Sequence, residues 1–173
     1  KRKEFCNMNM YIRRNMLAAG VSLLATGVFA ARDEIELKDW TLQDAAVVEA
    51  QAKREGWFRY NSACQTTEGE KLSLNGYDPK GWYKATVPGT VLTTLVDNGV
   101  YPEPTYGENN RPEIIPDDLC RKDWWYRTKV RIPDSFKDKT VWLNFDGINY
   151  HAEIWVNGRI TGRMTGAFKR RSF

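Results

Sequence analysis

The feature that most constrains the fold is a series of alternating apolar and polar residues between Trp124 and Thr161. Residues 124–132 alternate with the period of two that a half-buried strand requires, and residues 141–145 and 152–156 repeat the pattern. Asn157-Gly158 predicts a two-residue type I′ turn, because both residues tolerate positive φ, and residues 159–162 then return as the next strand. The pattern predicts an antiparallel sheet whose strands have one apolar and one polar face.

Upstream, residues 35–42 and 82–87 are expected to be strands, and residues 66–81 a connection. A short helix is predicted near residues 90–98, where four apolar residues share one helical face and Thr90 can cap the start. Residues 44–56 fit either a helix or a strand, since their periodicity does not decide between them.

The first 31 residues have the pattern of a secretory leader. A basic pair, Arg13-Arg14, precedes an apolar run over residues 16–29 that is shorter than the ~20 residues of a spanning helix. We therefore interpret residues 1–31 as sequence upstream of the true start plus a signal peptide, outside the fold, and residues 32–173 as the domain. Export to the periplasm or the cell exterior is expected, without a stable membrane anchor.

The net charge of +4 comes from the leader, which holds five basic residues and one acidic residue. The whole chain has 26 basic and 22 acidic residues. Without the leader, 21 of each remain, so the rest of the chain has no net charge. The basic pI is therefore no argument for a nucleic-acid partner, and none is expected.

Three stretches resemble one known family: WWYR at 124–127, FDGINYHAEIWVNG at 145–158 and ATVPGTVLTTLVDNGVYPEP at 85–104. They are similar to the N-terminal sugar-binding domain of glycoside hydrolase family 2, nearest to its exo-β-glucosaminidase and β-mannosidase branch. The resemblance implies an all-β, antiparallel, jelly-roll-like sandwich of the galactose-binding type, with one short helix near 90–98. In the family an immunoglobulin-like domain and a (β/α)₈ catalytic barrel follow, so we expect residues 32–173 to be an incomplete sandwich.

The resemblance also implies the activity of the parent protein, a retaining hydrolase of O-glycosyl bonds in β-linked glycosides that needs no cofactor. The family places both catalytic glutamates on the barrel. No catalytic residue is therefore expected here, and the chain alone should be inactive, its sandwich shaping or supporting the barrel's pocket. We interpret the acidic pairs Glu68/Glu70 and Asp117/Asp118 as solvated loop charge.

Residues 101–123 contain four prolines and almost no periodicity, as in a long loop that is functional or disordered. Residues 104–110 resemble a family loop that packs toward the barrel. Its candidate substrate contacts are Tyr106, which can stack on a sugar ring, and Glu108 and Asn109, which can hydrogen-bond to hydroxyls. The alternative is that the loop's Asn side chains serve its own backbone.

Two further readings stay open. Exposed tryptophans (Trp57, Trp125, Trp142, Trp155) would suit a stand-alone carbohydrate-binding module, whereas buried ones would complete a core or an interface. Trp142 and Trp155 occupy the polar positions of their alternating strands, which favours exposure. A scaffold without sugar contact is a third option. Cys64 and Cys120 remain after removal of the leader and can form a disulfide in an exported protein. His151 is the one histidine, so no metal site is expected.

Overall fold

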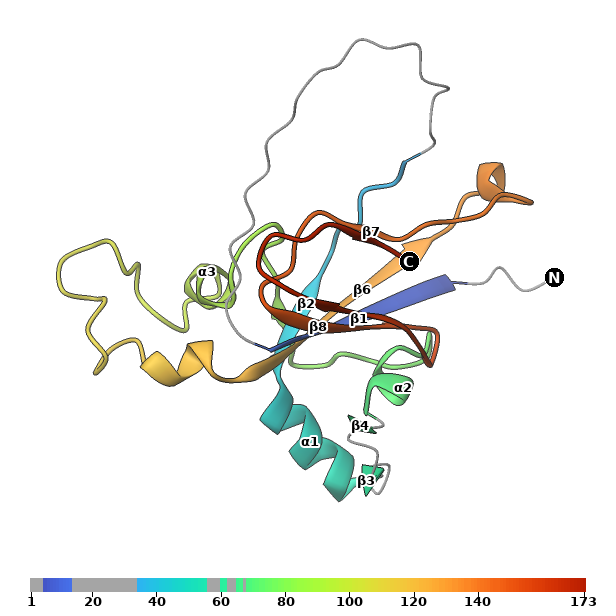
Figure 1. Ribbon diagram of the computed structural model, residues 1–173. Helices are drawn as coiled ribbons and strands as arrows, with labels where there is room; N and C mark the ends of the chain where they lie inside the picture. Colours follow the sequence, from blue (N-terminus) through green and yellow to red (C-terminus); the bar gives the residue numbers. More distant parts are fainter. Residues whose placement is uncertain (1–4, 14–33, 56–59, 62–64, 67) are drawn as a thin grey trace, which may run out of the picture.

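A computed structural model describes residues 5–13, 34–55, 60–61, 65–66 and 68–173, with backbone only for residues 5–13, 60–61 and 65–66 (Figure 1). Its main element is a six-stranded sheet in which each pair of neighbours is antiparallel. In spatial order the strands are β5 (Tyr83–Lys84), β2 (Thr41–Asp44), β6 (Asp123–Arg131), β1 (Phe5–Arg13), β8 (His151–Val156) and β9 (Arg159–Thr165). The predicted all-β, antiparallel class is confirmed.

Smaller elements complete the architecture. They are the strand pairs β7 (Asn144–Phe145) with β10 (Arg171–Ser172) and β3 (Tyr60–Asn61) with β4 (Gln65–Thr66), the helices α1 (Ala45–Arg54), α2 (Glu68–Leu72) and α3 (Val91–Asp97), and the 3₁₀ turns Asp117–Cys120 and Asp134–Phe136. Figure 1 shows α1 and α2 on one side of the large sheet and β7 on the other. The small β7–β10 sheet is thus the second layer of the sandwich.

The central strand predictions hold. β6 and β8 coincide with the predicted alternating runs, and the β8–β9 hairpin turns at Asn157 (φ 49°) and Gly158 (φ 86°), as a type I′ turn requires. The hairpin is fixed to α2, because the Gly158 N–H donates to Ser73 Oγ at 2.8 Å and that hydroxyl donates to Gly69 O at 2.7 Å.

Other boundaries differ from the prediction. The strand expected over 35–42 begins only at Thr41, and regular pairing near 141–145 is restricted to β7. The undecided segment 44–56 is α1, since Asp44 in extended conformation caps it by accepting the Ala46 N–H at 2.8 Å. α2 lies within residues 66–81, which we predicted to be a connection without a helix. That prediction was wrong for residues 68–72, because five residues are too few to show a helical period.

The predicted helix near 90–98 is confirmed as α3. The Thr90 hydroxyl accepts the Thr93 N–H at 3.0 Å, and the helix ends before Gly99, whose φ of 71° favours glycine. Leu95 on this helix is buried in the main core, which explains how so short a helix is held.

The main core lies between the large sheet, α3 and the β7–β10 layer. Several of its members come from alternate positions of β6 and β8, one comes from α3, and others come from β2, β9 and the adjoining loops. The members are Trp40, Leu42, Leu95, Trp124, Tyr126, Ile148, Ala152, Ile154 and Met164. Phe145 and Phe173 of the small layer pack against this core and meet edge to face, with ring centroids 6.2 Å apart. The predicted apolar face of each strand is therefore the one that faces the second layer.

Part of the opposite face of the sheet is also buried, which corrects the expectation of a polar face there. Trp125 and Trp155 form a second cluster there with Val48 of α1 and Leu72 of α2. Five consecutive residues of β6, from Trp124 to Thr128, are buried as a result. The helices that cover this face lie far from β6 in sequence, so the alternation within β6 could not reveal them.

Arg127 of β6 is a charged residue buried beneath these helices, and its hydrogen bonds compensate for the burial. Its guanidinium, on a residue only 2% exposed, donates to the carbonyl oxygens of Leu72 (3.0 Å), Leu74 (3.3 Å) and Tyr77 (3.1 Å). The Tyr77 ring centroid lies 5.6 Å from the guanidinium carbon, within range of a cation–π contact. Burial lowers the pKa of Arg127, and Tyr77 and Asp78 nearby oppose that shift.

We expected residues 1–31 to lie outside the fold, and the structure differs for part of that range. β1 (Phe5–Arg13) occupies the middle of the large sheet and pairs with both β6 and β8. The apolar run 16–29 lies outside the described residues, so the signal peptide stays a prediction. In the part of the chain that is described, no helix combines the length and apolar character needed to cross a bilayer.

Gly69 tests the packing of α2 on the sheet. A Cβ at this position would lie 2.4 Å from Trp155 Cε2, whereas a Cβ at Gly76 would meet no atom within 4 Å. Gly69→Ala should therefore destabilise the protein by about 1–3 kcal/mol through overpacking, although alanine favours helix. Gly76→Ala should change the stability by no more than about 0.5 kcal/mol. Urea denaturation followed by circular dichroism measures both, and equal stabilities would mean that Trp155 moves freely away from α2.

Candidate functional site

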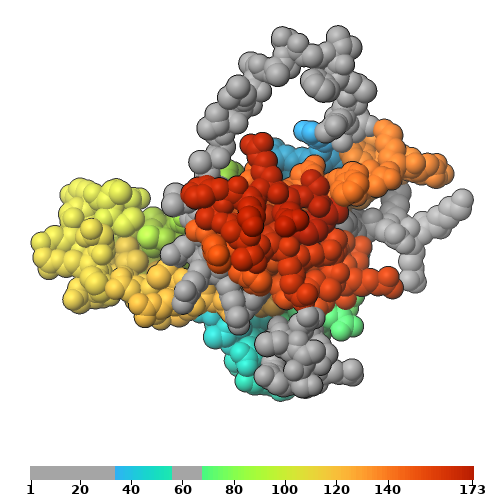
Figure 2. All heavy atoms as spheres, in the orientation of Figure 1, coloured from blue at the N-terminus to red at the C-terminus, as the bar shows by residue number. Residues whose placement is uncertain are grey.

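The long loop predicted over 101–123 is the candidate site. The structure confirms that it lacks helices and strands, apart from the 3₁₀ turn Asp117–Cys120 and the start of β6 at Asp123. Figure 2 shows this segment, in yellow, standing out from the body of the molecule. Both of its ends are tied to the sandwich, so its position is set by the fold.

At its N-terminal end the loop follows α3, which is bonded to the strand β5 and the residues after it. Asn98 Nδ2 donates to Lys84 O at 2.9 Å, and the Thr86 N–H donates to Thr94 Oγ1 at 3.0 Å. The Val100 N–H then donates to Leu95 O at 2.8 Å as the chain leaves the helix. These contacts fix the point at which the loop departs.

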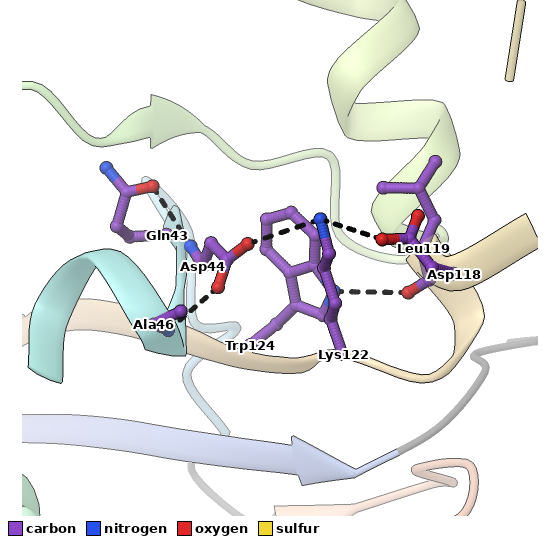
Figure 3. Close-up of polar contacts among 7 residues, drawn as sticks. All are labelled: Gln43, Asp44, Ala46, Asp118, Leu119, Lys122 and Trp124. Atoms are coloured by element: carbon purple, nitrogen blue, oxygen red, sulfur yellow. Dashed lines mark hydrogen bonds and ion pairs between the residues drawn. The ribbon is translucent and has the colours of Figure 1, made fainter. Parts of the chain in front are cut away.

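At its C-terminal end the loop is held by a polar cluster, drawn in Figure 3. The Lys122 ammonium lies 3.3 Å from Asp118 Oδ2 and 3.8 Å from Asp44 Oδ2, so one cation joins the 3₁₀ turn to the start of α1. The Trp124 indole N–H donates to Leu119 O at 3.4 Å and adds a contact from β6. Sequence reasoning did not single out this cluster, although Asp118 and Lys122 have the i, i+4 spacing of a helical ion pair.

The tip of the loop is bonded mainly to itself. The Glu103 carboxylate accepts hydrogen bonds from the Thr105 N–H (3.2 Å) and hydroxyl (2.8 Å), and Asn109 Nδ2 donates to Glu103 O at 3.0 Å. The Asn109 amide nitrogen thus serves the loop's own backbone, as the alternative reading predicted. Glu108 forms an ion pair with Arg111, in which its side chain stays 71% exposed.

Tyr106 differs from its neighbours in the tip. It is 78% exposed, and its backbone makes two of the turns that shape the loop, by donating to Glu103 O and accepting from the Asn109 N–H, each at 3.3 Å. The structure therefore brings the three predicted contact residues together, and it presents the aromatic ring of Tyr106 to the surroundings. An exposed ring on a shaped loop can stack on a sugar or insert into a protein surface.

The tryptophans in the described part of the chain do not form a shared exposed platform. Trp125 and Trp155 are buried under α1 and α2, so the inference that the polar phase of Trp155 indicates exposure was wrong. Trp142 is 62% exposed, as its own phase predicted, and Trp57 lies outside the described residues. A large aromatic residue at the polar positions of an alternating strand can face a second core instead of solvent. The alternation in sequence does not distinguish between these two environments.

The acidic pairs and His151, which the sequence also offered as candidate groups, are not part of a binding site in the described residues. Glu68 is only 2% exposed at the start of α2, so its interpretation as solvated loop charge was wrong; Glu70 and Asp117 are exposed. His151 Nδ1 lies 3.0 Å from Thr165 Oγ1 across the β8–β9 pair. No group of three potential metal ligands occurs among the described residues.

Cys120 is a free thiol in the structure and donates to Asp117 O at 2.9 Å within the 3₁₀ turn. Cys64 lies outside the described residues, so the Cys64–Cys120 disulfide stays a prediction. Its formation would add a covalent tie to the C-terminal end of the loop.

The two roles of Asp44 at the base of the loop can be separated by substitution. Asp44→Asn keeps a good helix cap and loses the ion pair with Lys122, and should cost about 0–1 kcal/mol of stability. Asp44→Ala loses the cap as well and should cost a further ~0.5–2 kcal/mol. Urea denaturation gives the two costs, and amide hydrogen exchange of residues 117–122 should accelerate in both variants. Unchanged exchange would mean that the cluster does not hold the loop.

Comparison with known proteins gives this site its context. A family profile described as "Glycosyl hydrolase 2 galactose-binding domain-like" matches residues 40–173. Exo-beta-D-glucosaminidase from Amycolatopsis orientalis is 30% identical over 112 residues, which are 63% of this chain and 10% of that protein. Mannosylglycoprotein endo-beta-mannosidase from Lilium longiflorum is 35% identical over 123 residues, 68% of this chain and 13% of that protein.

Beta-mannosidase from Rattus norvegicus is 33% identical over 90 residues, 51% of this chain and 10% of that protein. The chain thus spans about a tenth of the length of these relatives. No solved structure matches the chain. The resemblance to the exo-β-glucosaminidase and β-mannosidase branch of family 2 is confirmed, as is the galactose-binding-like fold. Because the family profile covers well over half of the chain, from Trp40 to Phe173, the chain belongs to the glycosyl hydrolase 2 galactose-binding domain-like family.

Proposed function

We propose that this chain is the non-catalytic N-terminal part of an exported glycosidase that hydrolyses O-glycosyl bonds of β-linked glycosides. Its sandwich packs on a (β/α)₈ barrel and shapes the substrate pocket there. The proposal is supported by the relatives, which carry the names of β-glycosidases and are about ten times longer than the matched segment. Catalysis, in this proposal, is carried out by residues outside this chain.

The observation that carries the proposal is the geometry of the 101–123 loop. Contacts from α3 fix one end of it and the Lys122 cluster fixes the other. A loop held at both ends presents its tip at a defined position and loses little further entropy when it binds. Such a tip suits the rim of a pocket built mainly by another domain.

Within the tip we assign the direct contact to Tyr106, whose exposed ring can stack on a pyranose at the edge of the pocket. Glu108 keeps an exposed carboxylate and can accept hydrogen bonds from sugar hydroxyls. Asn109 acts through its oxygen and through the shape of the loop, since its amide nitrogen is bonded to Glu103 O.

Tyr106→Ala in the full-length glycosidase tests this assignment. Loss of a stacking contact should lower kcat/KM by roughly 2- to 10-fold, mostly through KM, with an unchanged melting temperature. Phe168→Ala is the matched control, because Phe168 is 90% exposed and lies outside the loop. If both variants keep the parental kcat/KM, the loop is a scaffold without sugar contact.

The alternative function is a stand-alone carbohydrate-binding module, for which the exposed Trp142 is the supporting observation. We expect this chain alone to show neither turnover nor binding. The assay uses chromogenic β-mannoside, β-galactoside and β-glucosaminide substrates, together with oligosaccharide titration followed by tryptophan fluorescence. Fluorescence quenching that Trp142→Ala abolishes would favour the module, and turnover that depends on a carboxylate here would refute a catalytic centre elsewhere.

A further inference from the structure

Three Asn-Gly pairs occur in the chain: Asn75-Gly76, Asn98-Gly99 and Asn157-Gly158. In such a pair the backbone nitrogen of the glycine can attack the side-chain amide of the asparagine, since glycine has no Cβ to hinder the approach. The attack needs a glycine N–H that no acceptor holds, and space in which the two groups can meet. The three pairs differ in both respects.

Two of the pairs are held by the fold. The Gly158 N–H donates to Ser73 Oγ at 2.8 Å, and a Cβ at Gly158 would lie 3.2 Å from Leu74 Cδ2, so this turn is also crowded. The Gly99 N–H donates to Val96 O at 2.9 Å. A reaction at either pair therefore requires the β8–β9 hairpin or the end of α3 to open first.

The third pair, Asn75-Gly76, lies in an open turn. Both residues are exposed, and they closely follow α2, which lies on the opposite side of the large sheet from β7 (Figure 1). The Gly76 N–H has no acceptor among the described residues. A Cβ at Gly76 would meet no atom within 4 Å. The Gly76 nitrogen is therefore available for attack without any opening of the fold.

This pair lies inside the anchor of Arg127. The guanidinium donates to Leu74 O at 3.3 Å and to Tyr77 O at 3.1 Å, and these two carbonyl groups flank Asn75-Gly76 in the chain. The Tyr77 N–H also donates to Leu74 O at 3.2 Å and closes the turn. A change in the length of the main chain within this turn would therefore disturb the hydrogen bonds of a buried charge.

We propose that Asn75-Gly76 is a self-modification site, at which Asn75 converts spontaneously to aspartate and isoaspartate and the isoaspartate weakens the anchor of Arg127. Solvent base removes the proton of the Gly76 N–H, and the nitrogen forms a bond to Asn75 Cγ. The Cγ–Nδ2 bond breaks, and the side-chain nitrogen takes up a proton and leaves as ammonia. The product is a cyclic imide.

Water then opens the imide ring in one of two ways. Cleavage of the bond between Cγ and the Gly76 nitrogen gives aspartate on an unchanged main chain. Cleavage of the bond between the main-chain carbonyl carbon and that nitrogen gives isoaspartate, whose main chain runs through Cβ and Cγ and is longer by one carbon. Water is the co-reactant, and nothing is oxidised or reduced. The reaction is independent of the proposed role in a glycosidase, and its tests need no enzymatic activity.

The first test compares the three pairs in the full-length protein. Folded samples are incubated at mildly alkaline pH, which favours loss of the amide proton, and are then digested briefly with trypsin. Residues 72–80 are released as one peptide, because Lys71 and Lys80 precede the two cleavage points. Mass spectrometry should show conversion of Asn75 at least about tenfold faster than that of the other two pairs, which must open before they react.

The control for this test is the same incubation in urea, where the advantage of Asn75 should disappear because all three pairs are then open. Equal rates in the folded protein would overturn the proposal. An advantage of Asn75 that survives unfolding would also overturn it, since the local sequence and not the fold would then select the site.

The second test links the modification to the Arg127 anchor. Gly76→Ala places a Cβ beside the attacking nitrogen and should slow conversion of Asn75 several-fold, with unchanged rates at the other two pairs. Asn75→Asp carries the new charge on an unchanged main chain and should unfold at the parental urea concentration. The aged parental protein, with isoaspartate at position 75, should unfold at a lower urea concentration, and aged Gly76→Ala should not.

Two results of the second test would refute the proposal. One is an equal loss of stability on ageing in Gly76→Ala and in the parental protein, because the damaging change would then lie elsewhere. The other is unfolding of the isoaspartate form together with Asn75→Asp, because the length of this turn would then not matter to the bonds of Arg127.

Discussion

The rest of the structure depends on how Arg127 is accommodated in the middle of β6. A guanidinium taken from water into a nearly closed interior is costly unless its hydrogen bonds are replaced. Three carbonyl oxygens, of Leu72, Leu74 and Tyr77, replace them. The same bonds hold the 72–77 segment against the sheet and thereby bring α2 over Trp155. One side chain thus satisfies its own charge and anchors the layer that covers the second face.

The large sheet is the middle layer, with helices over part of one face and the β7–β10 layer on the other, and the functional candidates lie at its margins. The 101–123 loop leaves from α3 and returns at β6, so its position follows from the same packing that buries Leu95 and Trp124. The tip adds its own bonds, of which those to Glu103 are central. The chain therefore carries a projection whose shape is set by its own hydrogen bonds and by the contacts at its two ends.

Both edges of β6 are paired in the large sheet. β2 pairs with one edge, and β1 of the N-terminal segment pairs with the other. β1 also pairs with β8, so a segment far from both strands in the sequence joins β6 to the β8–β9 hairpin.

The sequence by itself determined the antiparallel strands β6, β8 and β9, the Asn157-Gly158 turn and α3, because period, turn chemistry and capping are local signals. It also located the loop that contains Tyr106, and three sequence stretches identified the family. Only the tertiary structure decided the burial of Trp125 and Trp155, the roles of Arg127 and Lys122, and the place of β1 in the sheet. Each of these depends on a partner far away in the chain. A period of two reports that the faces of a strand differ, and what covers each face is decided by packing.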